Sequence, residues 1–300
     1  MKTYGWELQI GWRDQIGDFK YGAKLSLSDS QSKILRYGNP TGSLSKYVEG
    51  ELIGNIYGYT TIGIAKTDEE MQQHLASLPN GGQSALGSQW AAGDIMYADL
   101  NGDGKINNGS YTINDMGDMK KIGNSTPRFM TGINLDAAYK GWDLQMFWQG
   151  VLKRDWWPGD KNMTFWGVTD GEWWSTSFKE HLDYFRTSEN PLGENLNSYY
   201  PRPIFNTKNN KSQTRYLQNA AYMRLKNIQV GYTFPKVWIN KLMLQNLRIF
   251  VSGENLLTIT SLSDTMDPET CGAGYQSTEQ ANGTVYPLAK TISFGLSVNF

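Results

Sequence analysis

The sequence contains few of the residues on which enzymes and disulfide-rich secreted domains depend. It has one cysteine, Cys271, and two histidines, His74 and His181, among 300 residues. A single cysteine excludes an internal disulfide framework. The histidines are far apart in sequence, and the motifs of nucleophilic, zinc-dependent and phosphate-binding enzymes are absent. We therefore expect packing or surface roles for both histidines, and no enzymatic activity.

Long apolar segments and an excess of charge are also lacking. No run of about 18 apolar residues occurs, which excludes a transmembrane helix but not membrane-spanning strands, whose apolar residues alternate with polar ones. The net charge of −1 gives no reason to expect a nucleic-acid partner. The first residues, Met1 to Thr3, lead into a strand without the apolar segment of a signal peptide. If the protein is exported, we expect this chain to be the C-terminal piece of a longer one.

Aromatic residues and glycine are abundant, with 11 Trp, 17 Tyr, 11 Phe and 32 Gly. In the last stretch, apolar residues alternate strictly with small or polar ones: Ile292, Phe294, Leu296, Val298 and Phe300. Successive strand residues point to opposite faces, so the stretch predicts a strand with one apolar and one polar face. It suits the closing strand of an outer-membrane barrel, with Phe300 as the assembly signal. A soluble sandwich strand would show the same alternation.

Similar alternation recurs along the chain and predicts seven strands, near residues 4–13, 19–28, 128–139, 142–150, 221–234, 247–257 and 289–300. The connections after the first, third and fifth strands are short, and the others are long. Outer-membrane barrels have short periplasmic turns and long extracellular loops. The pattern therefore predicts an all-β fold, an antiparallel transmembrane β-barrel segment with long extracellular loops and its C-terminus on the periplasmic side.

The fifth strand contains a change of parity. Met223 and Leu225 are out of step with Ile228 and Val230, which continue the apolar face. A β-bulge, or a covered upper half of the strand, would account for the change.

A loop rich in Asp and Asn is a candidate Ca²⁺ site. Asp99, Asn101 and Asp103 have the spacing of oxygen ligands in a calcium loop, and the carbonyl of Lys105 would be a further ligand. The twelfth position is Ser110, so a carboxylate such as that of Asp115 or Asp118 would have to replace the usual one. The alternative is an Asx-rich turn over 99–107 that binds nothing.

The loop 155–185 is dense in aromatic residues and is a candidate for substrate contact. Its rings could stack on the faces of sugars, or they could simply pack to make a large loop rigid. If any contact a substrate, we expect them to be Trp156, Trp157, Trp166, Trp173 and Trp174.

Several long stretches, in order, make the chain resemble the C-terminal part of SusC/RagA-type TonB-dependent outer-membrane transporters. They are GDIMYADLNGDGKIN (93–107), IGNSTPRFMTGIN (122–134), TRYLQNAAYMRLKNIQVGYTFP (214–235), LRIFVSGENLLT (247–258) and YPLAKTISFGLSVNF (286–300). The resemblance implies a barrel of about 22 strands filled by an N-terminal plug, of which residues 1–300 would supply the last seven strands. The plug and the TonB-binding segment have no counterpart in this sequence.

The resemblance also implies partners and a task. The parent protein would import a glycan or an oligopeptide, with a SusD-like surface lipoprotein covering its extracellular loops and the TonB complex supplying energy. Barrel assembly machinery would insert it into outer-membrane lipid. Seven strands alone would leave two open edges in that lipid, so we do not expect them to close a barrel by themselves. The alternative function is a secreted all-β carbohydrate-binding module with a structural calcium site.

Overall fold

A seven-stranded antiparallel sheet dominates the fold of this computed structural model, which describes residues 1–271 and 287–300. In spatial order its strands are β1 (Lys2–Ile16), β2 (Phe19–Lys33), β7 (Arg128–Tyr139), β8 (Trp142–Lys153), β11 (Tyr222–Thr233), β12 (Asn246–Thr260) and β13 (Thr291–Asn299). Each strand pairs with its predecessor in this order. The expectation of a mostly antiparallel β structure is confirmed. Among the described residues, β1 pairs only with β2 and β13 only with β12, so the sheet is open.

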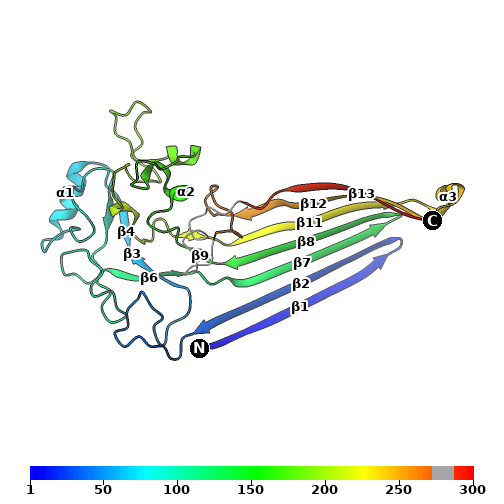
Figure 1. The fold of residues 1–300 in the computed structure, drawn as a ribbon, viewed down its shortest axis with the longest axis horizontal. Coiled ribbons are helices and arrows are strands. Elements are labelled where there is room, and N and C mark those ends of the chain that lie inside the picture. Colours follow the sequence, from blue (N-terminus) through cyan, green and yellow to red (C-terminus); the bar gives the residue numbers. More distant parts are fainter. Residues whose placement is uncertain (272–286) are drawn as a thin grey trace.

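The two ends of the sheet differ in what connects the strands (Figure 1). At one end, residues 17–18 join β1 to β2, and Lys140 and Gly141, both with positive φ, join β7 to β8. Helices α3 (Lys236–Ile239) and η4 (Asn240–Leu242) join β11 to β12 at the same end. At the other end lie residues 34–127, 154–221 and 261–271, which we call the loop cap. No helix among the described residues is long and apolar enough to cross a membrane.

Residues that are paired across neighbouring strands form rows, and most rows are either apolar or polar along their length. One row contains only apolar side chains and runs from β1 to β12: Ile10, Leu25, Ile133, Trp148, Leu225 and Leu257. A row three residues away along β2, on the opposite face, contains glycine and polar side chains only: Gly22, Asp136, Gln145, Gln229, Ser252 and Ser293. Large apolar residues stay exposed across the apolar face, with Phe294 81% exposed. The polar face is buried at Arg224, near the loop-cap end, whereas the apolar face keeps many large side chains exposed.

A bulge keeps the apolar row continuous through β11. The register shifts between Leu225 and Asn227 against both β8 and β12. The extra residue, Lys226, turns Leu225 onto the same face as Ile228. Of the two explanations that the sequence left open for the parity change, the structure has the bulge.

A charge pair spans three strands on the polar face. Arg248 of β12 binds Asp143 of β8 through two hydrogen bonds, of 2.6 Å from Nη2 and 3.0 Å from Nε. Gly231 of β11 lies between them, and a Cβ at that position would lie only 2.6 Å from Asp143 Oδ2. Glycine is therefore required where the two long side chains meet above the strand.

The loop cap has its own secondary structure. It contains three two-stranded sheets and several short helices, namely β3 (Asn55–Tyr59) with β6 (Met119–Asn124), β4 (Thr61–Ile64) with β5 (Ile95–Tyr97), β9 (Asp155–Trp156) with β10 (Gln218–Asn219), α1 (Asp68–Ala76), α2 (Met163–Trp166), η1 (Gly167–Thr169), η2 (Lys179–Leu182) and η3 (Lys208–Asn210). Thr67 caps helix α1, because its Oγ1 accepts the backbone N–H of Glu70 at 3.2 Å. The Glu70 carboxylate accepts the N–H of Lys66 rather than that of Thr67.

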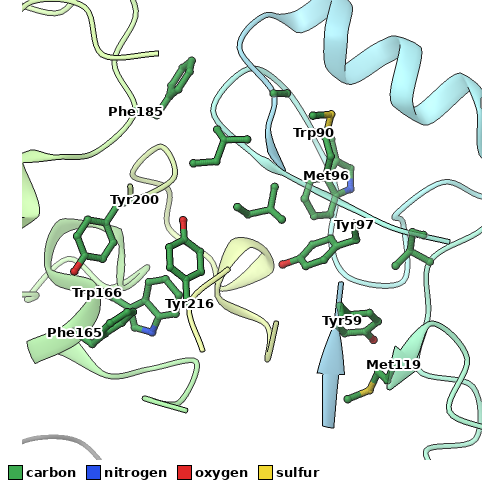
Figure 2. Close-up of a cluster of buried hydrophobic side chains, with 14 of the residues drawn as sticks. Tyr59, Trp90, Met96, Tyr97, Met119, Phe165, Trp166, Phe185, Tyr200 and Tyr216 are labelled. Atoms are coloured by element: carbon green, nitrogen blue, oxygen red, sulfur yellow. The ribbon is translucent and has the colours of Figure 1, made fainter. Parts of the chain in front are cut away.

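The hydrophobic core lies in the loop cap rather than against the sheet. Its buried residues come from all three long connections, and aromatic rings form much of it (Figure 2). The Trp166 ring lies 4.9 Å from the Phe165 ring and 4.8 Å from the Tyr216 ring, centre to centre, with edges directed at faces. Cys271 is buried at the margin of this core. The long connections are therefore a packed unit and not open loops.

A fully buried carboxylate, Asp94, joins the first connection to the second. It binds Arg202 through two hydrogen bonds of 2.8 and 2.9 Å, Lys208 Nζ at 2.8 Å and Asn209 Nδ2 at 2.9 Å. Burial raises the pKa of Asp94, but these donors outweigh burial and hold it below the usual range. The Lys208 ammonium also lies 4.5 Å from the centre of the Trp90 ring. Asp94 thus stays ionised and holds two cations from a distant segment.

We expect the substitution Asp94→Asn to destabilise the loop cap by about 3–5 kcal/mol, because it leaves the buried Lys208 ammonium without a counter-charge. Lys208→Met is the matched control and should cost less, since Asp94 keeps Arg202 and Asn209. Hydrogen exchange of amides in α1 and β5 would measure both effects. Equal losses of protection in the two variants would contradict the central role of the carboxylate.

Candidate functional site

The five tryptophans singled out in the sequence occupy two different environments. Trp156 and Trp166 are buried in the aromatic core, and half-buried Trp157 packs against Trp166 with ring centres 6.1 Å apart. Asn162 caps helix α2 by accepting the N–H of Phe165 at 3.1 Å. This cap directs the following two aromatic side chains inward. Trp156 and Trp166 therefore stabilise the core of the loop cap. Because both are buried, the expectation that they contact a substrate is wrong for this conformation.

Trp173 and Trp174 are in the opposite situation. They are 79% and 54% exposed, and their rings meet edge to face with centres 5.2 Å apart. An ion pair of 3.2 Å between Lys161 and Glu172 joins the segment before α2 to the residue that precedes the pair. Of the five tryptophans, these two alone are exposed, and they form a paired aromatic surface on the loop cap.

His181 is a neutral ring that bonds to the backbone at Phe165 and Phe178. Its Nδ1 accepts the backbone N–H of Phe178 at 2.8 Å, so Nε2 carries the proton and donates to the carbonyl of Phe165 at 3.1 Å. Burial lowers the pKa of His181, which keeps the ring uncharged. His74 is similar: its Nε2 lies 3.1 Å from Gln83 Oε1, and burial lowers its pKa. Both histidines are packing residues, as expected.

The Asp/Asn loop is closed by hydrogen bonds from its own backbone. Asp99 accepts the N–H groups of Gly102 and Gly104 at 2.7 and 2.8 Å. Asn101 accepts that of Asp103, and Asp103 accepts that of Lys105. Burial raises the pKa of Asp99, but the donors from Gly104 and Gly102 outweigh it and lower the pKa overall. The loop is therefore pre-formed with its oxygens gathered around backbone amides.

Asp118 lies behind this loop and was not a first choice from the sequence. It is fully buried and accepts the N–H groups of Leu100 and Asn107 at 2.9 and 2.8 Å. Burial raises the pKa of Asp118, and the negative charge of Asp99 raises it further. The Asp115 carboxylate instead accepts hydrogen bonds from the N–H and the hydroxyl of Ser110. No group of three or more His, Cys, Asp or Glu side chains among residues 1–271 and 287–300 is arranged to hold a metal ion.

The residues that organise the loop cap could not have been found from sequence motifs. Asp94 and Arg202 are 108 positions apart, and no local pattern indicates that they pair. The same holds for Gln213, whose buried amide donates to the carbonyl of Asn209 at 2.7 Å and to the Tyr97 hydroxyl at 3.2 Å. Only the folded chain brings these partners together.

The whole chain is similar in sequence to part of two known receptors. No family model matches the sequence. The chain is 27% identical over 322 residues to TonB-dependent receptor P3 of Formosa agariphila and 24% identical over 335 residues to TonB-dependent receptor P39 of the same organism. Both alignments cover 100% of this chain but only 29% and 30% of the relatives. The chain therefore spans less than a third of the length of these curated relatives.

Solved structures show the same fold. The RagAB peptide transporter matches with a TM-score of 0.65 at 18% identity, over 99% of this chain and 29% of the other. The RagAB peptide importer in its closed-closed state matches with a TM-score of 0.62, also at 18% identity, over 99% and 29%. The named relatives are receptors and transporters, not enzymes. The resemblance inferred from the sequence is thus confirmed: the chain is similar along its whole length to TonB-dependent receptors, and it has the fold of the matched part of the RagAB structures.

Proposed function

We propose that this chain is the C-terminal barrel portion of a SusC/RagA-type TonB-dependent importer of the outer membrane. The observation that carries the proposal is the apolar face of the seven-stranded sheet, which is continuous from Ile10 to Leu257 and leaves large side chains such as that of Phe294 exposed. In a soluble protein such a face would be an aggregation hazard or an interface. In a barrel wall it faces lipid, while the polar face lines the lumen. The importer also accounts for the open edges at β1 and β13, where further strands of a longer parent would pair.

The parent's partners follow from this proposal. The loop cap would lie outside the cell, where a SusD-like lipoprotein covers it, and the short turns would lie in the periplasm. TonB would act through the plug, encoded upstream of this chain. Phe300, which follows β13 and is exposed at the short-turn end, would be the residue read by the barrel assembly machinery.

The transported molecule would be a glycan or an oligopeptide. Trp173 and Trp174 are suited to either, because exposed indole rings stack on the C–H faces of sugars and pack against apolar or cationic peptide side chains. The name of the RagAB structures states a peptide for that transporter. A secreted carbohydrate-binding module is less suitable, because it would have to expose the whole apolar face of the sheet to water.

Lipid facing can be tested with two neighbouring positions on opposite faces of β13. In the full-length parent, Phe294→Arg should cost about 2–4 kcal/mol in the bilayer and sharply reduce surface protein. Ser293→Arg faces the polar side, opposite Ser252, and should be tolerated better. Protease shaving of intact cells measures the surface level. Similar levels for the two variants would exclude the proposed facing of the sheet.

Substrate contact can be tested at the aromatic pair. We expect Trp173→Ala with Trp174→Ala to weaken ligand binding by about 2–6 kcal/mol if both rings stack on the ligand, with the surface level unchanged because both rings are exposed. Phe205→Ala, at an exposed aromatic position elsewhere in the loop cap, is the matched control. Calorimetry with a panel of oligosaccharides and oligopeptides would measure binding. Unchanged affinity for every ligand that the parent binds would remove the pair from the site.

Calcium at the 99–107 loop also remains a proposal. The side-chain oxygens of Asp99, Asn101 and Asp103 would hold the ion with the Lys105 carbonyl, and the buried Asp118 would add negative charge behind them. The ion would offset the repulsion between these carboxylates.

If this proposal is right, calcium should protect residues 93–120 of the parent from proteolysis, and Asp103→Ala should abolish the protection. Asp115→Ala is the control, because its carboxylate binds Ser110 rather than the loop. Cleavage that is insensitive to chelator in the unsubstituted protein would leave an Asx-rich turn with no ion.

A further inference from the structure

The connection between β11 and β12 differs from the other two short turns. The others consist of two residues each, whereas this one contains α3 and η4 (Figure 1). Ile239 is buried and fixes the turn, and the Gln245 N–H donates to the Asn299 carbonyl of β13 at 2.8 Å. Around this fixed point, three large apolar side chains project outward: Val237, Trp238 and Met243 are 77%, 60% and 87% exposed. A periplasmic turn in water has no reason to present them.

The exposed tryptophan continues the apolar face of the sheet. The Trp142 ring of β8 lies 4.9 Å from Tyr232 of β11, Tyr232 lies 5.1 Å from Phe234, and Phe234 lies 6.3 Å from Trp238, all between ring centres. Trp142 and Tyr232 are paired residues on the same face as Leu144 and Val230. The aromatic series therefore runs from the last row of the apolar face onto α3.

The charge of the turn has one sign. Lys236 and Lys241 are exposed, and no Asp or Glu occurs from Phe234 to Phe250. Neither lysine forms an ion pair with any side chain in the described ranges. Trp and Lys at the edge of an apolar surface are the residues that settle at the boundary between acyl chains and headgroups.

We propose that the α3–η4 turn is a membrane anchor that binds anionic phospholipid in the leaflet at the short-turn end. Val237, Trp238 and Met243 enter the outer part of the acyl region, and the ammonium groups of Lys236 and Lys241 bind headgroup phosphates. The proposal rests on the proposed function, since it requires lipid along the apolar face. Continuity with that face, together with two unpaired cations, favours lipid over a periplasmic protein as the occupant.

Depth measurements on the full-length parent test the anchor. Nitroxide labels are placed at Val237→Cys and Met243→Cys in a variant without other reactive cysteines, reconstituted in phosphatidylcholine vesicles with or without phosphatidylglycerol. Collision with oxygen relative to a water-soluble nickel chelate reports burial in lipid. Phe205→Cys, exposed in the loop cap, gives the water reference, and Phe294→Cys gives the lipid reference. We expect the oxygen-to-nickel ratio at 237 and 243 to exceed that at 205 several-fold.

The references separate the possible failures. If the label at 294 is in water, the proposed function fails. If the label at 294 is in lipid but those at 237 and 243 are in water, the anchor is wrong and the turn is free for a protein partner. The double substitution Lys236→Gln with Lys241→Gln should lower the ratio in vesicles that contain phosphatidylglycerol and leave it unchanged in phosphatidylcholine alone. No change in the anionic vesicles would overturn the phosphate contact.

Discussion

The constraint on which the whole structure depends is the alternation of side chains along a strand. It gives the seven-stranded sheet one apolar face, and that face must leave water. Burial of a large apolar side chain is worth about 1.5–3 kcal/mol. The face carries many such residues, so leaving it in water would cost a large amount of free energy. Nothing in the described chain covers it. A lipid environment satisfies the face as built and accounts for why the sheet is not folded onto the loop cap.

The loop cap solves a different problem with different chemistry. It has a core of its own, and aromatic rings such as Trp166 and Tyr216 provide much of it. A core assembled from segments far apart in sequence also needs something to fix which segments meet. Asp94 does this with two cations, because a buried carboxylate tolerates only partners of matching charge and geometry. The resulting support leaves few aromatic side chains, Trp173 and Trp174 among them, for contacts outside the chain.

The sequence predicted the mostly antiparallel β structure but not the contacts that hold the loop cap together, for one physical reason. A strand with one apolar face shows a local pattern, since every second residue is apolar, and the parity change at Leu225 indicated a bulge or a covered upper half, of which the structure has the bulge. The loop cap is held by pairs such as Asp94 and Arg202, and no local pattern reports a partner 108 residues away. The tryptophans illustrate the limit. Trp166 and Trp173 come from the same aromatic segment, and only packing decides that one is core and the other surface.

The third connection shows how the loop cap is joined to the sheet. Arg154, just after β8, donates to the carbonyls of Pro268 and Cys271 at 3.3 and 2.9 Å. Asp267 of the same segment binds Arg224 of β11 at 2.9 Å, in a buried pair on the polar face. The three connections are thus tied to one another and to the strands beneath them. Because the Arg224–Asp267 pair is largely removed from water, displacement of the third connection would leave a buried charge unpaired, which is strongly destabilising.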